Sequence, residues 1–134
     1  MRLVLDASVA VASLRPHEPD YRAARARLRR IANGDDLAVV PSIFVTEVAG
    51  ALARLGFERA AIDAFVAALT STPHEVMTIG PKRALAAAGI AVCTKLRGAD
   101  AMYVWLAARE GVPLCTLDRE MLARSAAICE AIVP

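Results

Sequence analysis

Short apolar runs alternate with longer segments of helical periodicity along the whole chain, and this alternation limits the folds open to it. The apolar runs predict strands at residues 3–5, 37–40, 75–79, 113–116 and 128–133. The segments between them predict helices at residues 7–14, 21–32, 41–55, 58–69, 80–94, 99–109 and 118–124. Strands separated by helices form parallel sheets, so we expect a single α/β domain, residues 1–134, whose sheet of about five mostly parallel strands has helices on both faces.

The composition fits one globular domain and excludes several classes of protein. Of the 134 residues, 57% are apolar and 22% charged, which is enough to form a core and argues against disorder. Asp6 interrupts the first apolar run, and no apolar stretch reaches the roughly 18 residues of a membrane span. Cys93, Cys115 and Cys129 lie in apolar surroundings without paired metal-ligand spacing, and we expect reduced core thiols. The protein is therefore expected to be cytoplasmic, with no membrane association.

Two aspartates follow predicted strands. Asp6 comes directly after the first strand, and Asp118 follows the fourth. The carboxyl ends of parallel strands meet at one edge of a sheet, so the two acids lie together if these strands are neighbours. Each acid alone has a structural explanation, because aspartate after a strand commonly caps a helix or forms a turn.

Two further acids lie in predicted helices. Glu47 flanks a stripe of apolar residues predicted to be buried, namely Phe44, Val48, Ala51 and Leu55. A carboxylate at the edge of a buried stripe needs a partner, and a salt bridge would suffice. Asp100 begins a helix that is apolar almost all round, where the helix dipole alone would favour an acid.

A cluster of these four acids would need a cation, because like charges raise each other's pKa and destabilise the fold. Carboxylate oxygens are the ligands that Mg²⁺ and Mn²⁺ prefer, and such ions activate water for attack on phosphodiesters. A serine nucleophile is disfavoured, since His17 and His74, the two histidines, lie near prolines in predicted loops. An all-acid site thus indicates metal-dependent phosphodiester hydrolysis.

Four motifs in order resemble those of PIN-domain ribonucleases. They are Leu5-Asp6-Ala7-Ser8-Val9, Pro41-Ser42 followed by Glu47, Ala99-Asp100-Ala101-Met102-Tyr103, and Thr116-Leu117-Asp118. No single motif is specific, but together they span essentially the whole chain. Its size and layout resemble, more narrowly, the VapC-type toxins of toxin-antitoxin pairs.

The resemblance implies a role for each matching residue. Asp6, Glu47 and Asp100 match the family's metal-binding acids, and Asp118 matches a fourth that ligates or orients a second ion or its water. Ser8 and Thr116 match hydroxyls that hydrogen-bond to the carboxylates or to water. The family cleaves RNA with Mg²⁺ or Mn²⁺, commonly as a homodimer, and a small antitoxin protein covers the active-site groove. All four acids are present here.

Basic residues suggest where RNA phosphates could bind. Lys95 and Arg97 precede Asp100 closely, which places them near the expected metal. Arg22, Arg25 and Arg29 share one side of a predicted helix and could bind an RNA backbone or an acidic antitoxin segment, or simply form a solvated face. A net charge of +2 does not by itself indicate nucleic acid binding.

Two alternatives to a ribonuclease remain open. A non-catalytic PIN-fold module could keep the acids and bind RNA or protein, and only the complete acid set argues against it. A receiver-type phosphoacceptor also gathers acids and Mg²⁺ at a strand edge, but it needs a lysine after its last strand, where this chain has residues 130–134 without one. Helices at residues 42–55 and 81–94 are richer in Ala, Val and Leu than one buried face requires, which favours a homodimer.

Overall fold

The computed structural model describes residues 1–134 and contains one five-stranded sheet in which every neighbouring pair is parallel. The strand order is β3-β2-β1-β4-β5. The strands are β1 (Arg2–Leu5), β2 (Leu37–Pro41), β3 (Glu75–Met77), β4 (Leu114–Cys115) and β5 (Ala131–Ile132). The predicted parallel α/β sheet is confirmed, and the first and fourth strands are neighbours.

The central strand β1 explains the continuous apolar run near the start of the chain. Val4 lies opposite Val39 of β2 on one side and Leu114 of β4 on the other, and all three are fully buried. A strand with both faces covered has no polar face, so its residues need not alternate. Leu3, Val4 and Leu5 therefore form the middle of the core.

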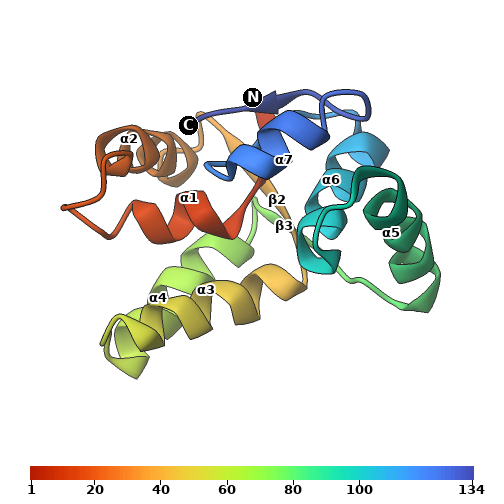
Figure 1. Ribbon diagram of the computed structural model, residues 1–134. Helices are drawn as coiled ribbons and strands as arrows, with labels where there is room; N and C mark the ends of the chain where they lie inside the picture. The colour runs from red at the N-terminus through yellow and green to blue at the C-terminus, as the bar shows by residue number, and fades with distance from the viewer.

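Seven helices connect and cover the strands. They are α1 (Ala7–Ala12), α2 (Tyr21–Ala32), α3 (Ile43–Arg54), α4 (Arg59–Thr70), α5 (Pro81–Thr94), α6 (Gly98–Glu110) and α7 (Arg119–Arg124). Helices α1 to α4 pack on one another, and in Figure 1 they form one group, with α5 and α6 on the other side of the strands. None of the helices combines the length and the apolar character needed to cross a membrane.

Helix α6 is packed on more than one side, as its nearly uniform apolar character predicts. It contacts β1, β2 and β4 on one side and α5 on another. Tyr103, Val104 and Leu106 are fully buried in these contacts. This packing fixes the start of α6, and with it Asp100, beside the end of β1.

Some predicted boundaries are wrong. The last strand starts only at Ala131, because the amides of Ile128 and Cys129 both donate to the carbonyl oxygen of Ser125 and form a turn. In α3 the buried stripe is Phe44, Val48 and Leu52, not Ala51 and Leu55, because residues spaced by four face the core and Leu55 lies beyond the helix end.

The prediction of three core cysteines is correct only for Cys115, which is buried. Cys129 is half-buried. Cys93 is exposed, because α5 packs against α6 with one face and Cys93 lies on another.

Candidate functional site

Asp6 and Thr116 lie side by side where β1 and β4 end. Leu5 pairs with Cys115 in the sheet, and the Asp6 amide donates to the Cys115 carbonyl oxygen at 3.0 Å. Asp6 is only 5% exposed, and its Oδ2 accepts hydrogen bonds from Thr116 Oγ1, at 2.7 Å, and from the Ser8 hydroxyl. The two hydroxyls predicted to support the acids therefore hold this carboxylate.

The same hydroxyls also accept hydrogen bonds from the loop after β4, and the one to Ser8 joins this loop to the start of α1. The Leu117 amide donates to Ser8 Oγ at 3.1 Å, and the Asp118 amide donates to Thr116 Oγ1 at 3.0 Å. Asp118 caps α7, since its Oδ1 accepts from the Met121 amide at 2.9 Å. Only one Asp118 oxygen is used by the cap, so a structural role and a role at the site are compatible.

Glu47 reaches the site from the middle of α3. It is half-buried and has no ion-pair partner, so the salt bridge considered for it is absent. Its Oε2 instead accepts a hydrogen bond of 2.5 Å from the phenol of Tyr103 on α6. Burial, followed by the Glu47 carboxylate, raises the pKa of Tyr103 far above its ordinary value, so the phenol stays a donor.

Asp100 lies in the first turn of α6 and is 8% exposed. Its Oδ2 accepts from Arg97 Nε at 2.9 Å, and another nitrogen of Arg97 lies 3.5 Å from Asp118 Oδ2. A single guanidinium thus bridges two of the four predicted acids.

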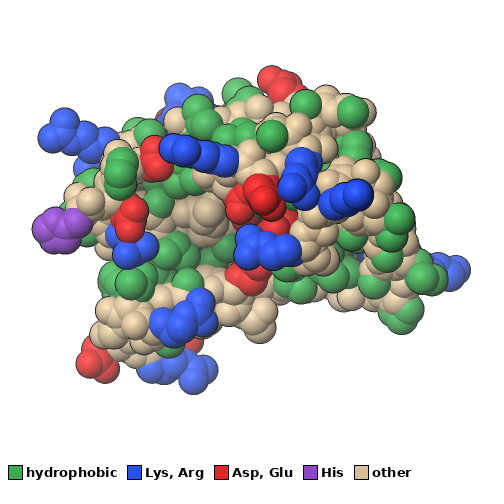
Figure 2. Space-filling view, viewed as in Figure 1, with side chains coloured by type: hydrophobic (Ala, Val, Ile, Leu, Met, Phe, Trp, Pro, Cys, Tyr) green, Lys and Arg blue, Asp and Glu red, His purple; other side chains and the backbone are tan.

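The pKa values of Asp6 and Glu47 are both shifted, in part by the negative charges of neighbouring acids. Burial raises the pKa of Asp6; hydrogen bonds from Ser8 and Thr116 oppose this, and the charge of Asp100 adds to it. Burial also raises the pKa of Glu47, with further contributions from the charges of Asp6 and Asp100 and opposition from the Tyr103 hydrogen bond. Figure 2 shows acidic side chains gathered near the centre of this face with basic side chains around them.

The carboxylates share one region without converging on a single point. No three His, Cys, Asp or Glu side chains lie close enough to one another to hold a metal ion as they stand. The donor chemistry nevertheless suits a hard cation, because all four groups are carboxylates and neither Asp6 nor Glu47 has a positively charged partner.

The predicted phosphate-binding residues fall into two groups. Lys95 is exposed just after α5, close in sequence to Arg97. Arg22, Arg25 and Arg29 are exposed on α2 and line a shallow hollow of about 230 Å³. Arg25 stacks over the Tyr21 ring at 5.9 Å, and no contact joins this second group to the acids.

Tyr103 lies in a helix predicted to be apolar almost all round, and sequence reasoning missed its hydrogen bond to Glu47. The residue is indeed fully buried, but its hydroxyl faces the site. The one available signal is its position three residues after Asp100, on the same side of α6.

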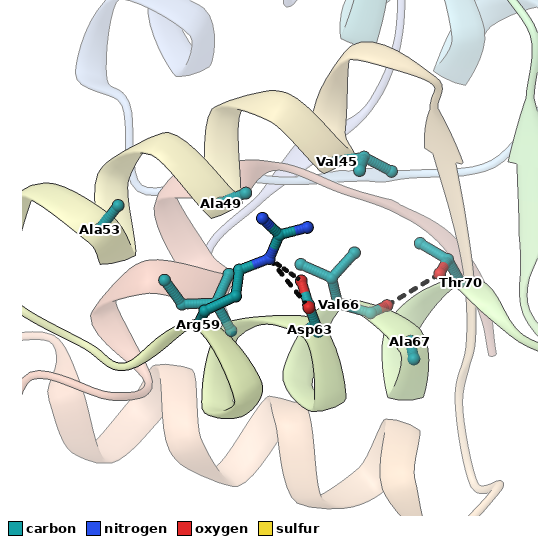
Figure 3. Close-up of a pocket in the computed structure, with 9 residues that line it drawn as sticks. Val45, Ala49, Ala53, Arg59, Asp63, Val66, Ala67 and Thr70 are labelled. Atoms are coloured by element: carbon teal, nitrogen blue, oxygen red, sulfur yellow. Dashed lines mark hydrogen bonds and ion pairs between the residues drawn. The ribbon is translucent and has the colours of Figure 1, made fainter.

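A larger groove lies between α3 and α4 and does not include the acids. Its volume is about 580 Å³, and most of its lining is small and apolar, including Val45, Ala49 and Val66 (Figure 3). Its charged residues, Arg59 and Asp63, pair with each other at 2.9 Å. The groove therefore offers no unpaired acid, base or nucleophile.

Comparison with known proteins identifies the fold. The sequence model of the PIN domain matches residues 3–127. Comparison with curated protein sequences finds no match. Among solved structures, PAE2754 from Pyrobaculum aerophilum is 25% identical, with a TM-score of 0.67 over 97% of this chain and 92% of that one.

Two further structures have the same fold at lower identity. VapC20 from Mycobacterium tuberculosis, a toxin that cleaves the sarcin-ricin loop, is 19% identical with a TM-score of 0.77, over 98% of this chain and 99% of that one. VapBC2 from Rickettsia felis, bound to a DNA fragment from its promoter, is 12% identical with a TM-score of 0.71, over 100% of this chain and 99% of that one.

Proposed function

The chain belongs to the PIN-domain family, and we propose that it is a metal-dependent endoribonuclease. The substrate is RNA, and the reaction is hydrolysis of a phosphodiester bond. Asp6, Glu47, Asp100 and Asp118 form the site, which takes Mg²⁺ or Mn²⁺.

The observation that carries this proposal is the pair of acids without a positive partner. Asp6 is almost fully buried and Glu47 half-buried, yet neither forms an ion pair, and the negative charge of Asp100 contributes to raising the pKa of both. Hydrogen bonds from side chains reach only one oxygen of each acid, and a buried carboxylate charge without a cation remains costly. A divalent cation supplies that compensation with oxygen ligands alone.

The chain's own residues have separable tasks in this mechanism. Ser8 and Thr116 fix one oxygen of Asp6, and Tyr103 fixes one oxygen of Glu47. Asp118 is held by its cap on α7, which leaves its second oxygen directed at Arg97. When bound, the metal ion lowers the pKa of the attacking water and stabilises the leaving oxygen.

We expect RNA phosphates to bind basic side chains around the acidic site. Lys95 is exposed beside Arg97, and α2 offers Arg22, Arg25 and Arg29 as a second contact for a longer strand or for an antitoxin. Of these five candidates, Arg97 differs because it is already paired with Asp100 and Asp118.

The biological role we propose is that of a toxin with an antitoxin protein as partner. The support is the resemblance to VapC-type toxins and the shared fold with VapC20 and VapBC2. If this is correct, expression of the chain alone arrests growth, co-expression with the product of a small reading frame immediately upstream relieves the arrest, and Asp6→Asn abolishes it.

The direct test is cleavage of mixed RNA by the purified chain in Mg²⁺, Mn²⁺ or EDTA. We expect cutting with either ion and none with EDTA, and loss of cutting in Asp6→Asn and Asp100→Asn variants shown to be folded. Asp63→Asn is the matched control, because Asp63 is exposed on α4 and outside the site. RNA binding that survives Asp6→Asn without cutting in any ion would instead support the non-catalytic module.

A homodimer through α5 is part of the proposal. Leu85 and Val92 are 75% and 80% exposed and lie seven residues apart on one side of this helix. Exposed large apolar side chains gathered on one helix face favour burial against a second copy.

A further inference from the structure

Arg97 is the only cation in ion-pair contact with the acidic site. It precedes the first turn of α6, and its guanidinium contacts Asp100 at 2.9 Å and Asp118 at 3.5 Å. One side chain therefore balances the charge of two of the four acids.

Arg97 contacts one oxygen of each of two acids that we propose to bind the metal ion. Both of its ion pairs end on Oδ2 atoms, that of Asp100 and that of Asp118. A divalent ion and a guanidinium cannot both occupy the space between these oxygens without repelling each other.

The Arg97 side chain is free to leave. It is 76% exposed, and apart from these carboxylates it has no other hydrogen-bonded side-chain partner. Only the guanidinium is exposed, whereas Asp100 is buried, so the cost of releasing Arg97 falls on that carboxylate and is offset when a divalent ion takes its place.

We propose that Arg97 is an internal counter-ion that occupies the acidic site in the absence of metal and is displaced from Asp100 and Asp118 when the ion binds. Arg97 thereby weakens metal affinity, and the acids stay compensated when no ion is present. This inference rests on the metal site of the proposed function.

The test is calorimetric titration of Mn²⁺ into the metal-free, full-length chain without RNA. We expect Arg97→Gln to bind Mn²⁺ three- to tenfold more tightly than the unaltered chain. Arg119→Gln is the matched control, because it removes the same charge next to Asp118 from an exposed residue without an ion pair, and its affinity should stay within twofold. Arg97→Lys keeps the charge, so its affinity should stay closer to that of the unaltered chain than to that of Arg97→Gln.

Three outcomes would overturn the inference: an unchanged or weaker affinity in a folded Arg97→Gln variant, an equal gain in Arg119→Gln, or an equal gain in Arg97→Lys. Metal-dependent RNA cleavage by the unaltered chain would still stand in each of these cases. Failure of the proposed function differs, since the unaltered chain would then neither bind Mn²⁺ nor cut RNA.

Discussion

At the level of single residues, the hydrogen bond from Tyr103 is the contact that orients Glu47 in the site. Glu47 has no other side-chain partner, so its orientation depends on a phenol that is fully buried in α6. A catalytic carboxylate that loses such a support can rotate away from its productive position.

We therefore predict that Tyr103→Phe lowers RNA cleavage about tenfold or more, the usual range for the loss of a supporting partner. Cleavage rates at saturating and limiting Mn²⁺ would check this, with circular dichroism to show that the variant is folded. Tyr21→Phe is the matched control, because the Tyr21 hydroxyl forms no side-chain hydrogen bond. Unchanged cleavage in Tyr103→Phe would mean that Glu47 does not need this support.

Asp36 is a second residue whose surroundings predict a measurable effect. It is fully buried, and Arg30, Arg27 and the amino group of Met1 bind its two oxygens at 2.8 to 3.0 Å. Hydrogen bonds from Arg30 are the largest cause holding its pKa well below the ordinary value, outweighing burial. A depressed pKa in the folded state means that Asp36 stabilises the protein above the unfolded pKa and stops doing so as pH falls through the folded pKa.

Asp36→Asn should therefore lower the free energy of unfolding at pH 7 by roughly 3 kcal/mol, the cost of breaking a buried ion pair. The difference from the unaltered chain should shrink as the pH is lowered below about 4, where unfolded aspartate protonates. Urea unfolding at several pH values measures it, with the exposed neighbour Asp35 changed to Asn as the control. A difference that stays constant between pH 7 and pH 3 would contradict the assignment.

At the scale of elements, helix α3 positions Glu47 by burying one face. Phe44, Val48 and Leu52 are fully buried at intervals of four residues, and Glu47 lies beside this stripe. Leu55, which the sequence pattern had placed in the stripe, is 43% exposed.

This difference predicts that Leu52→Ala destabilises the protein by about 2 to 5 kcal/mol, whereas Leu55→Ala changes stability by about 0.5 kcal/mol or less. Denaturant unfolding of the two variants makes the comparison directly, since the substitution is the same and only the burial differs. A loss from Leu55→Ala as large as that from Leu52→Ala would contradict the difference in burial between these two residues.

At the scale of the whole molecule, the strand order decides where the acids meet. Because β4 lies next to β1, Asp6 and Asp118 leave adjacent strand ends, and α3 and α6 add Glu47 and Asp100. The far face of α5 remains uncovered, with Leu85 and Val92 exposed.

If this face of α5 forms the homodimer interface, the Leu85→Glu variant should be monomeric, because a buried, unpaired carboxylate opposes association. Analytical ultracentrifugation at micromolar concentration would report the mass. Val133→Glu is the control, since it places the same charge on an exposed apolar residue outside both helices expected to favour the dimer. A monomeric mass for the unaltered chain would contradict the homodimer prediction.

Much of the fold could be predicted from local pattern. The helices, the strands and the parallel class follow from apolar spacing, because each element must bury its own apolar face. The four acids and the hydroxyls of Ser8 and Thr116 could be named from strand ends, helix starts and the family resemblance. Their catalytic roles remain predictions.

Local pattern was thus enough to predict the elements and the acid set, because both depend on residues near one another in the chain. Packing of the whole chain was needed to show that β1 and β4 are neighbours, that Tyr103 holds Glu47, and that Arg97 bridges Asp100 and Asp118. The Tyr103 and Glu47 partners lie 56 positions apart in the chain, and short-range spacing carries no information about which distant groups packing will bring together.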